Sequence, residues 1–222
     1  MRLAAPTALL ANAEPPPDCT LCPRLVEYRA ENRRENPDWF NAPVPSFGRI
    51  DAGLLVLGLA PGVSGANRTG RPFTGDYAGD LLYATLLKFG FARGTYGAHV
   101  RDGLELVNCR ISNAVRCVPP ENKPTTAEAN TCRTFLKSTL GAMDRLKVIV
   151  ALGRVAHDSA VRALSLKAAD APFAHAAIHE LKGGLTLIDS YHCSRYNTNT
   201  GRLTPEMFEV VFDQARSIMA RA

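Results

Sequence analysis

Five polar side chains lie in loops after predicted strands: the carboxylate of Asp76, the imidazole of His192 and the amides of Asn113, Asn122 and Asn197. A carboxylate can activate water and stabilise a cation, an imidazole can donate a hydrogen bond to a departing anion, and an amide can position water. Each type also has an ordinary structural use, because aspartate caps helices, histidine can end a strand and asparagine is common in turns. Because the carboxyl ends of parallel strands meet at one edge of a sheet, we expect these five side chains to lie close together there.

A second candidate site consists of cysteines. Cys19 and Cys22 form a C-x2-C pair that is followed directly by a proline, while Cys117 lies in a proline-rich loop and Cys132 in the helix predicted after it. Four thiolates can bind zinc or a [4Fe–4S] cluster, and the spacing alone does not distinguish the two. The alternative is a set of unrelated buried thiols, which is what we expect for Cys109.

The elements that position these residues follow from four continuous apolar segments. Such segments are typical of strands buried on both faces of a parallel sheet. We expect strands at 54–57, 104–111, 147–152 and 185–188. Helical spacing and capping signals predict helices over 25–34, 78–89, 155–166 and 205–220, and another that begins at Thr125 with a capping box to Glu128. This alternation predicts an α/β fold in which a short, mainly four-stranded parallel sheet carries helices on both faces.

The loop after the first strand has the composition of a ligand-binding loop. It runs from Gly58 to Asp76, is rich in glycine and proline, and carries the aromatic Phe73. Bare glycine backbone lets a ligand approach closely, and ligands of open α/β sheets bind just beyond the carboxyl ends of the strands. The alternative is an ordinary glycine-rich connection.

Length and composition predict one folded domain. The 222 residues are 46% hydrophobic, which suits a single domain over 18–222, and we expect the segment 1–17 to be a disordered tail. No apolar run is long enough to span a membrane, and the opening residues lack a clear signal peptide, so we expect a cytoplasmic protein. A net charge of +5 suits an anionic partner such as nucleic acid.

Three motifs resemble those of the uracil-DNA glycosylase superfamily, and most closely its family 5, an iron–sulfur branch of bacterial and archaeal enzymes. They are the loop residues 58–62 and 67–76, the segment 113–124 and the segment 192–201, and they occur in the family's order. The resemblance implies a three-layer α/β/α sandwich, a [4Fe–4S] cluster on the four candidate cysteines, and cleavage of the N-glycosidic bond of deaminated bases in DNA. The bases that it implies are uracil, hypoxanthine and related bases.

The same resemblance implies a pocket for one base. A base inside a stacked duplex must be flipped out before its bond can be cleaved. We expect the pocket to include Gly58, Leu59 and Ala60, with Phe73 as a stacking surface and Asn113 as the amide that reads the base edge. Core packing is the alternative for Phe73, and a turn cap is the alternative for Asn113.

The remaining roles concern catalysis and DNA contact. We expect His192 to line the base pocket and to donate a hydrogen bond to the departing base, with Asp76 or Asn122 positioning the water. Contacts to double-stranded DNA are expected from polar and basic side chains of the same loops, namely Arg68, Arg71, Lys123, Ser194, Arg195, Asn197 and Arg202. We expect a monomer that associates with the bacterial nucleoid through its DNA binding.

Two alternatives are kept. Family 4 enzymes have a glutamate where this sequence has Leu59, which favours family 5 over a family 4-like enzyme restricted to uracil. Some family 5 members lack the asparagine found here as Asn113, so the range of bases stays open at this stage. The other alternative is a non-catalytic nucleic-acid-binding module that a metal stabilises.

Overall fold

The central sheet of the computed structural model, which describes residues 13–221, is built around the fully buried strand β1. β1 pairs in parallel with β4 on one side and with β5 on the other, β5 pairs in parallel with β7, and β6 joins the far edge in antiparallel orientation. A separate two-stranded ribbon consists of β2 and β3. The strands are β1 (Leu54–Gly58), β2 (Ala92–Arg93), β3 (Glu105–Leu106), β4 (Cys109–Asn113), β5 (Val148–Leu152), β6 (Ile178–Glu180) and β7 (Thr186–Ser190).

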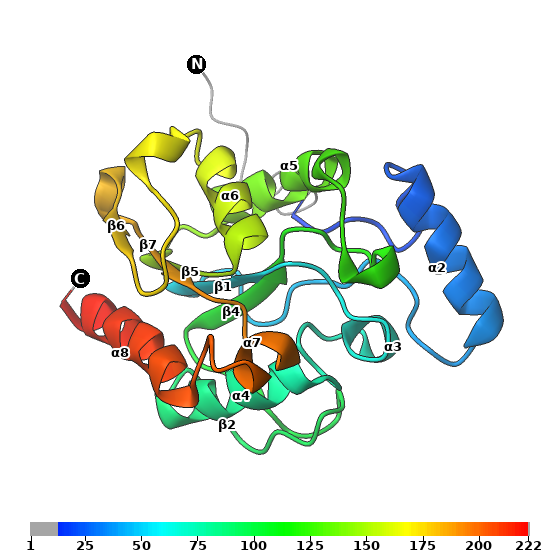
Figure 1. Cartoon of the computed structure of the whole chain (residues 1–222), viewed down its shortest axis with the longest axis horizontal. Coiled ribbons are helices and arrows are strands. Elements are labelled where there is room, and N and C mark those ends of the chain that lie inside the picture. Colours follow the sequence, from blue (N-terminus) through cyan, green and yellow to red (C-terminus); the bar gives the residue numbers. More distant parts are fainter. Residues whose placement is uncertain (1–12, 222) are drawn as a thin grey trace.

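Helices cover both faces of this sheet (Figure 1). Successive side chains of a strand point to opposite faces. Accordingly, Leu54 and Val56 pack in one core cluster with α4 and α8, whereas Leu55 and Leu57 pack in another with α5 and α6. The helices are α2 (Pro23–Glu35), α3 (Ala66–Thr69), α4 (Tyr77–Lys88), α5 (Thr126–Ala142), α6 (Arg154–Ala163), α7 (Arg195–Asn199) and α8 (Pro205–Arg221), with 3-10 turns η1 (Pro120–Asn122), η2 (Ala168–Asp170) and η3 (Lys182–Gly184). The predicted three-layer α/β/α sandwich is confirmed.

Two predicted helix starts have the expected caps. The hydroxyl of Thr125 accepts a hydrogen bond from the Glu128 backbone N–H, and the Glu128 carboxylate accepts one from the Thr125 N–H, which completes a capping box at α5. At α8 the hydroxyl of Thr204 accepts the backbone N–H of Met207. Both helices are therefore fixed where the chain leaves the carboxyl edge of the sheet.

The strand predicted over 104–111 is wrong in its bounds. Glu105 and Leu106 pair with β2 in the ribbon, and the central strand β4 begins only at Cys109. Between them Asn108 has a left-handed backbone with φ of 48°, and its side-chain oxygen accepts the Gly53 N–H at 2.6 Å. This turn separates two short strands that look like one apolar segment.

The edge strand β6 was not predicted. Its three residues are mostly exposed and pair only with β7, so neither an apolar run nor an alternating pattern identifies it. The sheet therefore has five strands, of which the predicted four are parallel.

The boundary of the predicted tail is also wrong for residues 13–17. Ala13 is buried, and the Glu14 carboxylate forms ion pairs with Arg110 and Arg116 at 2.8 Å each. The rest of the predicted tail lies outside the described residues. Within residues 13–221, none of the helices has the length and apolar character needed to cross a membrane.

Candidate active site

A cleft of about 600 Å³ opens where the chain leaves the carboxyl ends of β1, β4 and β7. The residues that line it are Leu59, Ala60, Gly62, Val63, Ser64, Gly75, Asp76, Tyr77, Ala78, Asn122, His192, Ser194 and Arg195. A smaller recess of about 30 Å³ shares part of this lining and adds Phe73 and Asn113. The structure thus brings together the side chains that were expected to bind a base and those expected to cleave its bond.

Gly58 lets two of these side chains meet over bare backbone. A Cβ atom on Gly58 would lie 2.4 Å from the Asn113 side-chain oxygen and 2.4 Å from the Phe73 ring. Asn113 is the last residue of β4 and pairs with Gly58 in the sheet. Its buried Oδ1 has no hydrogen-bond partner among the described residues, so it is available to a donor on a ligand. This open acceptor favours a reading role over a turn cap.

Phe73 is buried and holds a left-handed backbone conformation with φ of 52°. Such a conformation is strained for an aromatic residue and is typical of functional sites. The ring lies 6.1 Å from the His192 ring, centroid to centroid, with 27° between their planes. Two nearly parallel rings therefore line the recess, although Phe73 also belongs to the core cluster on the α4 side.

Asp76 serves as a helix cap and also lines the cleft. Its Oδ1 accepts a hydrogen bond from the Gly79 backbone N–H at 3.2 Å, so Asp76 does cap α4, as the structural alternative expected. Its Oδ2 lies against Gly62 and Gly65, where added Cβ atoms would be 3.1 Å and 2.3 Å away. Burial raises the pKa of this carboxyl, and the nearby charge of Asp80 adds to the effect.

His192 is uncharged at neutral pH because burial lowers its pKa to about 4. A neutral imidazole offers one N–H donor and one acceptor. The Asn197 side-chain amide donates to the His192 carbonyl at 2.8 Å and holds the segment after β7 in place. Asn197, expected to contact DNA, thus has a structural partner within the protein.

Asn122 lies on an unusual turn at the mouth of the cleft. Both Glu121 and Asn122 have left-handed backbones, with φ of 55° and 56°. The Asn122 side chain is exposed, and its Oδ1 would lie 4.0 Å from a Cβ on Gly62, the glycine that also contacts Asp76. The amide and the carboxylate therefore face the same part of the cleft.

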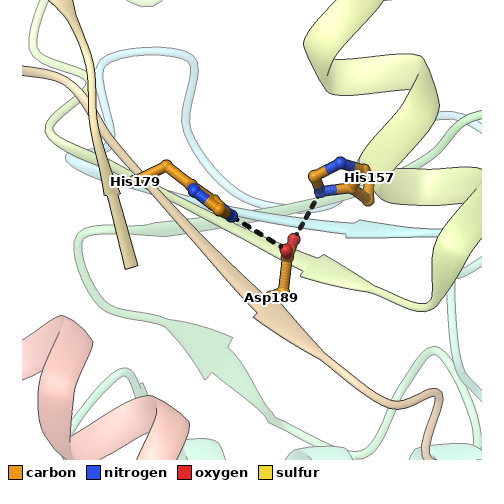
Figure 2. Close-up of side chains that lie close together, drawn as sticks. All are labelled: His157, His179 and Asp189. Atoms are coloured by element: carbon orange, nitrogen blue, oxygen red, sulfur yellow. Dashed lines mark hydrogen bonds and ion pairs between the residues drawn. The ribbon is translucent and has the colours of Figure 1, made fainter. Parts of the chain in front are cut away.

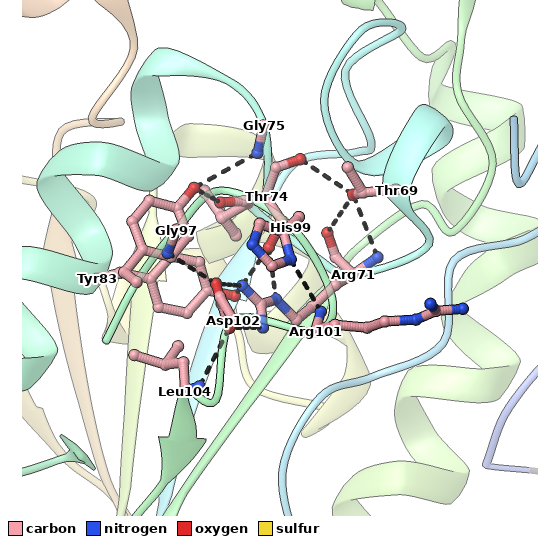
Figure 3. Close-up of polar contacts among 12 residues, drawn as sticks. Thr69, Arg71, Thr74, Gly75, Tyr83, Gly97, His99, Arg101, Asp102 and Leu104 are labelled. Atoms are coloured by element: carbon pink, nitrogen blue, oxygen red, sulfur yellow. Dashed lines mark hydrogen bonds and ion pairs between the residues drawn. The ribbon is translucent and has the colours of Figure 1, made fainter. Parts of the chain in front are cut away.

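Arg71, which was expected to contact DNA, is buried and paired within the protein. Its guanidinium is 6% exposed and forms a two-pronged ion pair with Asp102, at 2.9 and 2.6 Å (Figure 3). Its Nε donates to the Thr74 hydroxyl at 2.7 Å, and the group lies over the rings of Tyr83 and Tyr96. This ion pair holds the pKa of Asp102 well below its usual range. Arg71 fastens the long loop to the β2–β3 connection.

The other expected DNA contacts lie at the surface around the cleft. Arg68, Lys123, Arg195 and Arg202 are exposed, and Arg195 lines the cleft with its guanidinium 5.4 Å from the Tyr77 ring. The Ser194 hydroxyl also lines the cleft and accepts the Asn197 N–H at the start of α7. Tyr77 was missed by the sequence reasoning, although its place directly after Asp76 was a usable signal.

All four candidate cysteines line one cavity beside α2 and α5. Burial raises the pKa of Cys117 to about 11 and that of Cys132 to about 12. Arg29 was missed by the sequence reasoning and lines the same cavity. It is 3% exposed, donates to the Cys117 sulfur at 3.3 Å and to the Cys19 carbonyl at 2.8 Å, and has no carboxylate partner in the described part of the chain. Its place seven residues after Cys22, two helical turns on, was a usable signal.

A third polar cluster is separate from both sites. Figure 2 shows Asp189 of β7 between His157 of α6 and His179 of β6. One carboxylate oxygen pairs with His157 at 2.7 Å and the other with His179 at 3.1 Å. None of the three lines the cleft, and both oxygens of the buried carboxylate already have imidazole partners. The cluster joins the edge strand and α6 to the sheet.

Comparisons with known proteins show which family this chain is similar to. The model of the uracil DNA glycosylase superfamily matches residues 45–216. A type-5 uracil-DNA glycosylase of Thermus thermophilus is 44% identical over 206 residues, which cover 90% of this chain and 93% of that protein. One of Mycobacterium tuberculosis is 42% identical over 209 residues, or 90% of this chain and 78% of the relative. A type-4 uracil-DNA glycosylase of Pyrobaculum aerophilum is 33% identical over 139 residues, which cover 62% of this chain and 57% of that protein.

Proposed function

Because this chain belongs to the type-5 branch of the uracil-DNA glycosylase superfamily, and is therefore a DNA N-glycosylase, we propose that it removes uracil and other deaminated bases from DNA and leaves an abasic site. The observation that carries the proposal is the meeting of an open amide acceptor, two nearly parallel rings and the half-buried carboxylate of Asp76 in one recess. In the reaction, the bond between the base and the sugar C1′ breaks, a water oxygen bonds to C1′ and loses one proton to solvent, and the released base takes up one proton.

The recess receives the flipped base. Phe73 provides the surface on which the base stacks, and stacking on an aromatic ring contributes about 1–3 kcal/mol per base. The unpaired Oδ1 of Asn113 accepts a hydrogen bond from a base N–H, and its amide nitrogen can donate to a base carbonyl. The extra side-chain atoms of any residue at Gly58 would close this recess.

His192 stabilises the leaving base. The base departs with the bonding electron pair, so negative charge develops on it. The uncharged imidazole donates a hydrogen bond to that charge, and solvent later protonates the released base. Because burial lowers the pKa of His192 to about 4, this donor keeps the same charge across the neutral range.

Asp76 positions the attacking water and stabilises the sugar cation. Its Oδ2 lies between two glycines on the cleft wall and is not used in capping α4. The Asn122 amide faces the same region and orients the water from the other side. Leu59 lines the cleft but has no polar side-chain atom that could bind water.

The proposed range extends to hypoxanthine. The recess shares Ala60, Gly62, Asp76, Ala78 and His192 with the cleft of about 600 Å³, so the larger ring of a purine can extend from the recess into the cleft, and Asn113 can offer either an acceptor or a donor. Cluster-loaded protein is incubated with duplexes that carry uracil or hypoxanthine opposite each normal base, and abasic sites are detected by alkaline cleavage. Release of both bases supports the full proposal, release of uracil alone supports a type-4-like range, and no release from any duplex overturns it.

We further propose that the four cysteines hold a [4Fe–4S] cluster. The buried guanidinium of Arg29 faces these sulfurs without a carboxylate partner among residues 13–221, and a cluster with four thiolates supplies the missing negative charge. When bound, the cluster supplies folding energy by joining α2 to α5.

Iron and sulfide analysis with visible absorption tests this assignment. About four irons and four sulfides per chain support the cluster, whereas one zinc per chain overturns it. The monomeric state and the association with nucleoid DNA also remain proposals. Sedimentation of the protein with and without duplex DNA tests both.

A further inference from the structure

A second pocket lies between α5 and α6, outside the base cleft. Its volume is about 120 Å³, and it is formed by the first two or three turns of both helices together with Pro124. Both helices cover the same face of the sheet and lie next to each other (Figure 1). The pocket is therefore a gap between two packed helices whose walls are fixed by the core.

Two arginines from different helices line this pocket. Arg133 comes from α5 and Arg162 from α6, and neither forms an ion pair within the part of the chain that the structure describes. Burial lowers the pKa of Arg133, and the charge of Arg162 adds to the effect. The Arg133 Nε is buried and has no hydrogen-bond partner among residues 13–221. The pocket therefore carries two cations without carboxylate partners and one buried donor that is not used.

The neutral polar lining suits an oxyanion. Thr125, Thr126 and Ser159 contribute hydroxyl groups, and Asn130 lines the pocket while its side-chain oxygen accepts from Arg133 at 2.7 Å. Asp158 also lines the pocket and subtracts one charge, although it forms no ion pair among the described residues. The balance of side-chain charge remains positive.

The pocket adjoins the cleft along the chain on both sides. Pro124 is two residues after Asn122, so their Cα atoms are at most about 8 Å apart. Val155 is two residues after Gly153, where a Cβ would lie 3.3 Å from the His192 Cβ. A DNA strand advances by about 3.4 Å per nucleotide along its axis, so a strand that delivers a base to the cleft can place a nearby phosphate in this pocket.

We propose that the pocket lined by Arg133 and Arg162 binds a backbone phosphate of the DNA strand that carries the target base. This inference rests on the proposed function and adds a contact site remote from the loops that bind the base. In this site a phosphate oxygen accepts a hydrogen bond from the free Nε–H of Arg133, and the phosphate forms an ion pair with the guanidinium of Arg162. The contact fixes the register of the strand and does not read its sequence.

The salt dependence of DNA binding tests the proposal. A fluorescent duplex with a stable abasic analogue is titrated with cluster-loaded protein over a range of NaCl concentrations. For the double variant R133Q/R162Q we expect a several-fold higher Kd and a slope of log K against log salt that is shallower by about 0.9, the value for one phosphate. Asp158→Asn should shift the Kd in the opposite direction, because it removes a negative charge from the same pocket.

Lys137→Gln is the matched control, since Lys137 is exposed on α5 and does not line the pocket. An unchanged slope in the double variant, or an equal loss in Lys137→Gln, overturns the inference. A third outcome also overturns the inference: inorganic phosphate raises the thermal unfolding midpoint of the wild type but not of the double variant, while both proteins bind DNA equally. In that case the pocket binds free phosphate and not the DNA backbone. Visible absorption and the unfolding midpoint show that each variant is folded.

The base-release assay distinguishes failure of the phosphate site from failure of the proposed function. Wild-type protein that releases uracil while the double variant binds DNA normally would overturn only the phosphate site. Wild-type protein that releases no base would overturn the proposed function, and the titration on the abasic duplex would still report on the pocket.

Discussion

Replacing Asp76 by asparagine distinguishes its role as the cap of α4 from its role in the cleft. An asparagine oxygen can accept the Gly79 N–H, now 3.2 Å from Oδ1, with nearly the capping strength of aspartate. The negative charge and the basic Oδ2 beside Gly62 and Gly65 are lost. We expect base release to slow by about 10²–10⁴-fold, the usual contribution of a positioned base, with DNA binding largely kept.

The stability of the variants supplies an independent readout. Burial raises the pKa of Asp76, so its contribution to stability is fully present below the usual carboxyl pKa and is lost as pH rises through the higher folded value. At pH 7 the wild type therefore carries the cost of a buried charge, and Asp76→Asn should be at least as stable. Asp76→Ala removes the cap and should lower the free energy of unfolding by about 0.5–2 kcal/mol relative to Asp76→Asn.

Single-turnover release of uracil opposite guanine and urea unfolding measure the two quantities. Asp80→Asn is the matched control, because Asp80 lies in the first turn of the same helix and does not line the cleft. Asp80→Asn should release uracil at the wild-type rate near neutral pH. Because it removes a negative charge that raises the pKa of Asp76, the acid limb of its pH–rate profile should lie at lower pH than in the wild type. If Asp76→Asn releases uracil within about threefold of wild type, Asp76 is only a cap and the catalytic reasoning fails.

Three further predictions concern packing and charge. Gly58→Ala places a Cβ 2.4 Å from the Phe73 ring; we expect about 1–3 kcal/mol of destabilisation by urea unfolding and slower base release, and an unchanged KM and kcat would contradict this. Arg71→Gln leaves Asp102 buried without its partner and should cost about 3–5 kcal/mol at pH 7. That difference should shrink below about pH 4, where the unfolded carboxyl protonates, and a pH-independent difference would refute it. Arg29→Gln should lower the cluster's reduction potential and speed its loss in air, followed by visible absorption and redox titration; identical values would refute a charge-balancing role.

The parallel strands could be predicted because burial on both faces leaves a continuous apolar segment. β1 and β5 are buried throughout and stand out in the sequence for that reason. β6 has no such signal, since it pairs through its backbone at an exposed edge. The break at Asn108 was equally hidden, because it depends on a hydrogen bond to Gly53 that only the folded sheet provides.

The sequence predicted that the strand-end loops meet to form the candidate site, but it did not predict which arginines of these loops are buried and which are exposed. Arg68 and Arg71 stand three residues apart in one loop, yet Arg68 is exposed and Arg71 is buried. The difference comes from Asp102, which lies 31 residues further along and supplies the partner charge. No local pattern around Arg71 carries that information. The two arginines of the α5–α6 pocket escaped notice for the same reason, since each looks like an ordinary surface cation on its own helix.

The cleft concentrates features that are unfavourable one by one. Phe73 has a left-handed backbone, Asp76 has a half-buried carboxyl without an ion pair in the described residues, and Asn113 has a buried oxygen without a donor. Each costs stability when no ligand is bound, and the two apolar clusters on the faces of the sheet offset that cost. A flipped base and its attacking water would satisfy the amide and the carboxylate together. Destabilising features that one ligand can relieve are therefore evidence for a binding site, and the fold alone does not require them.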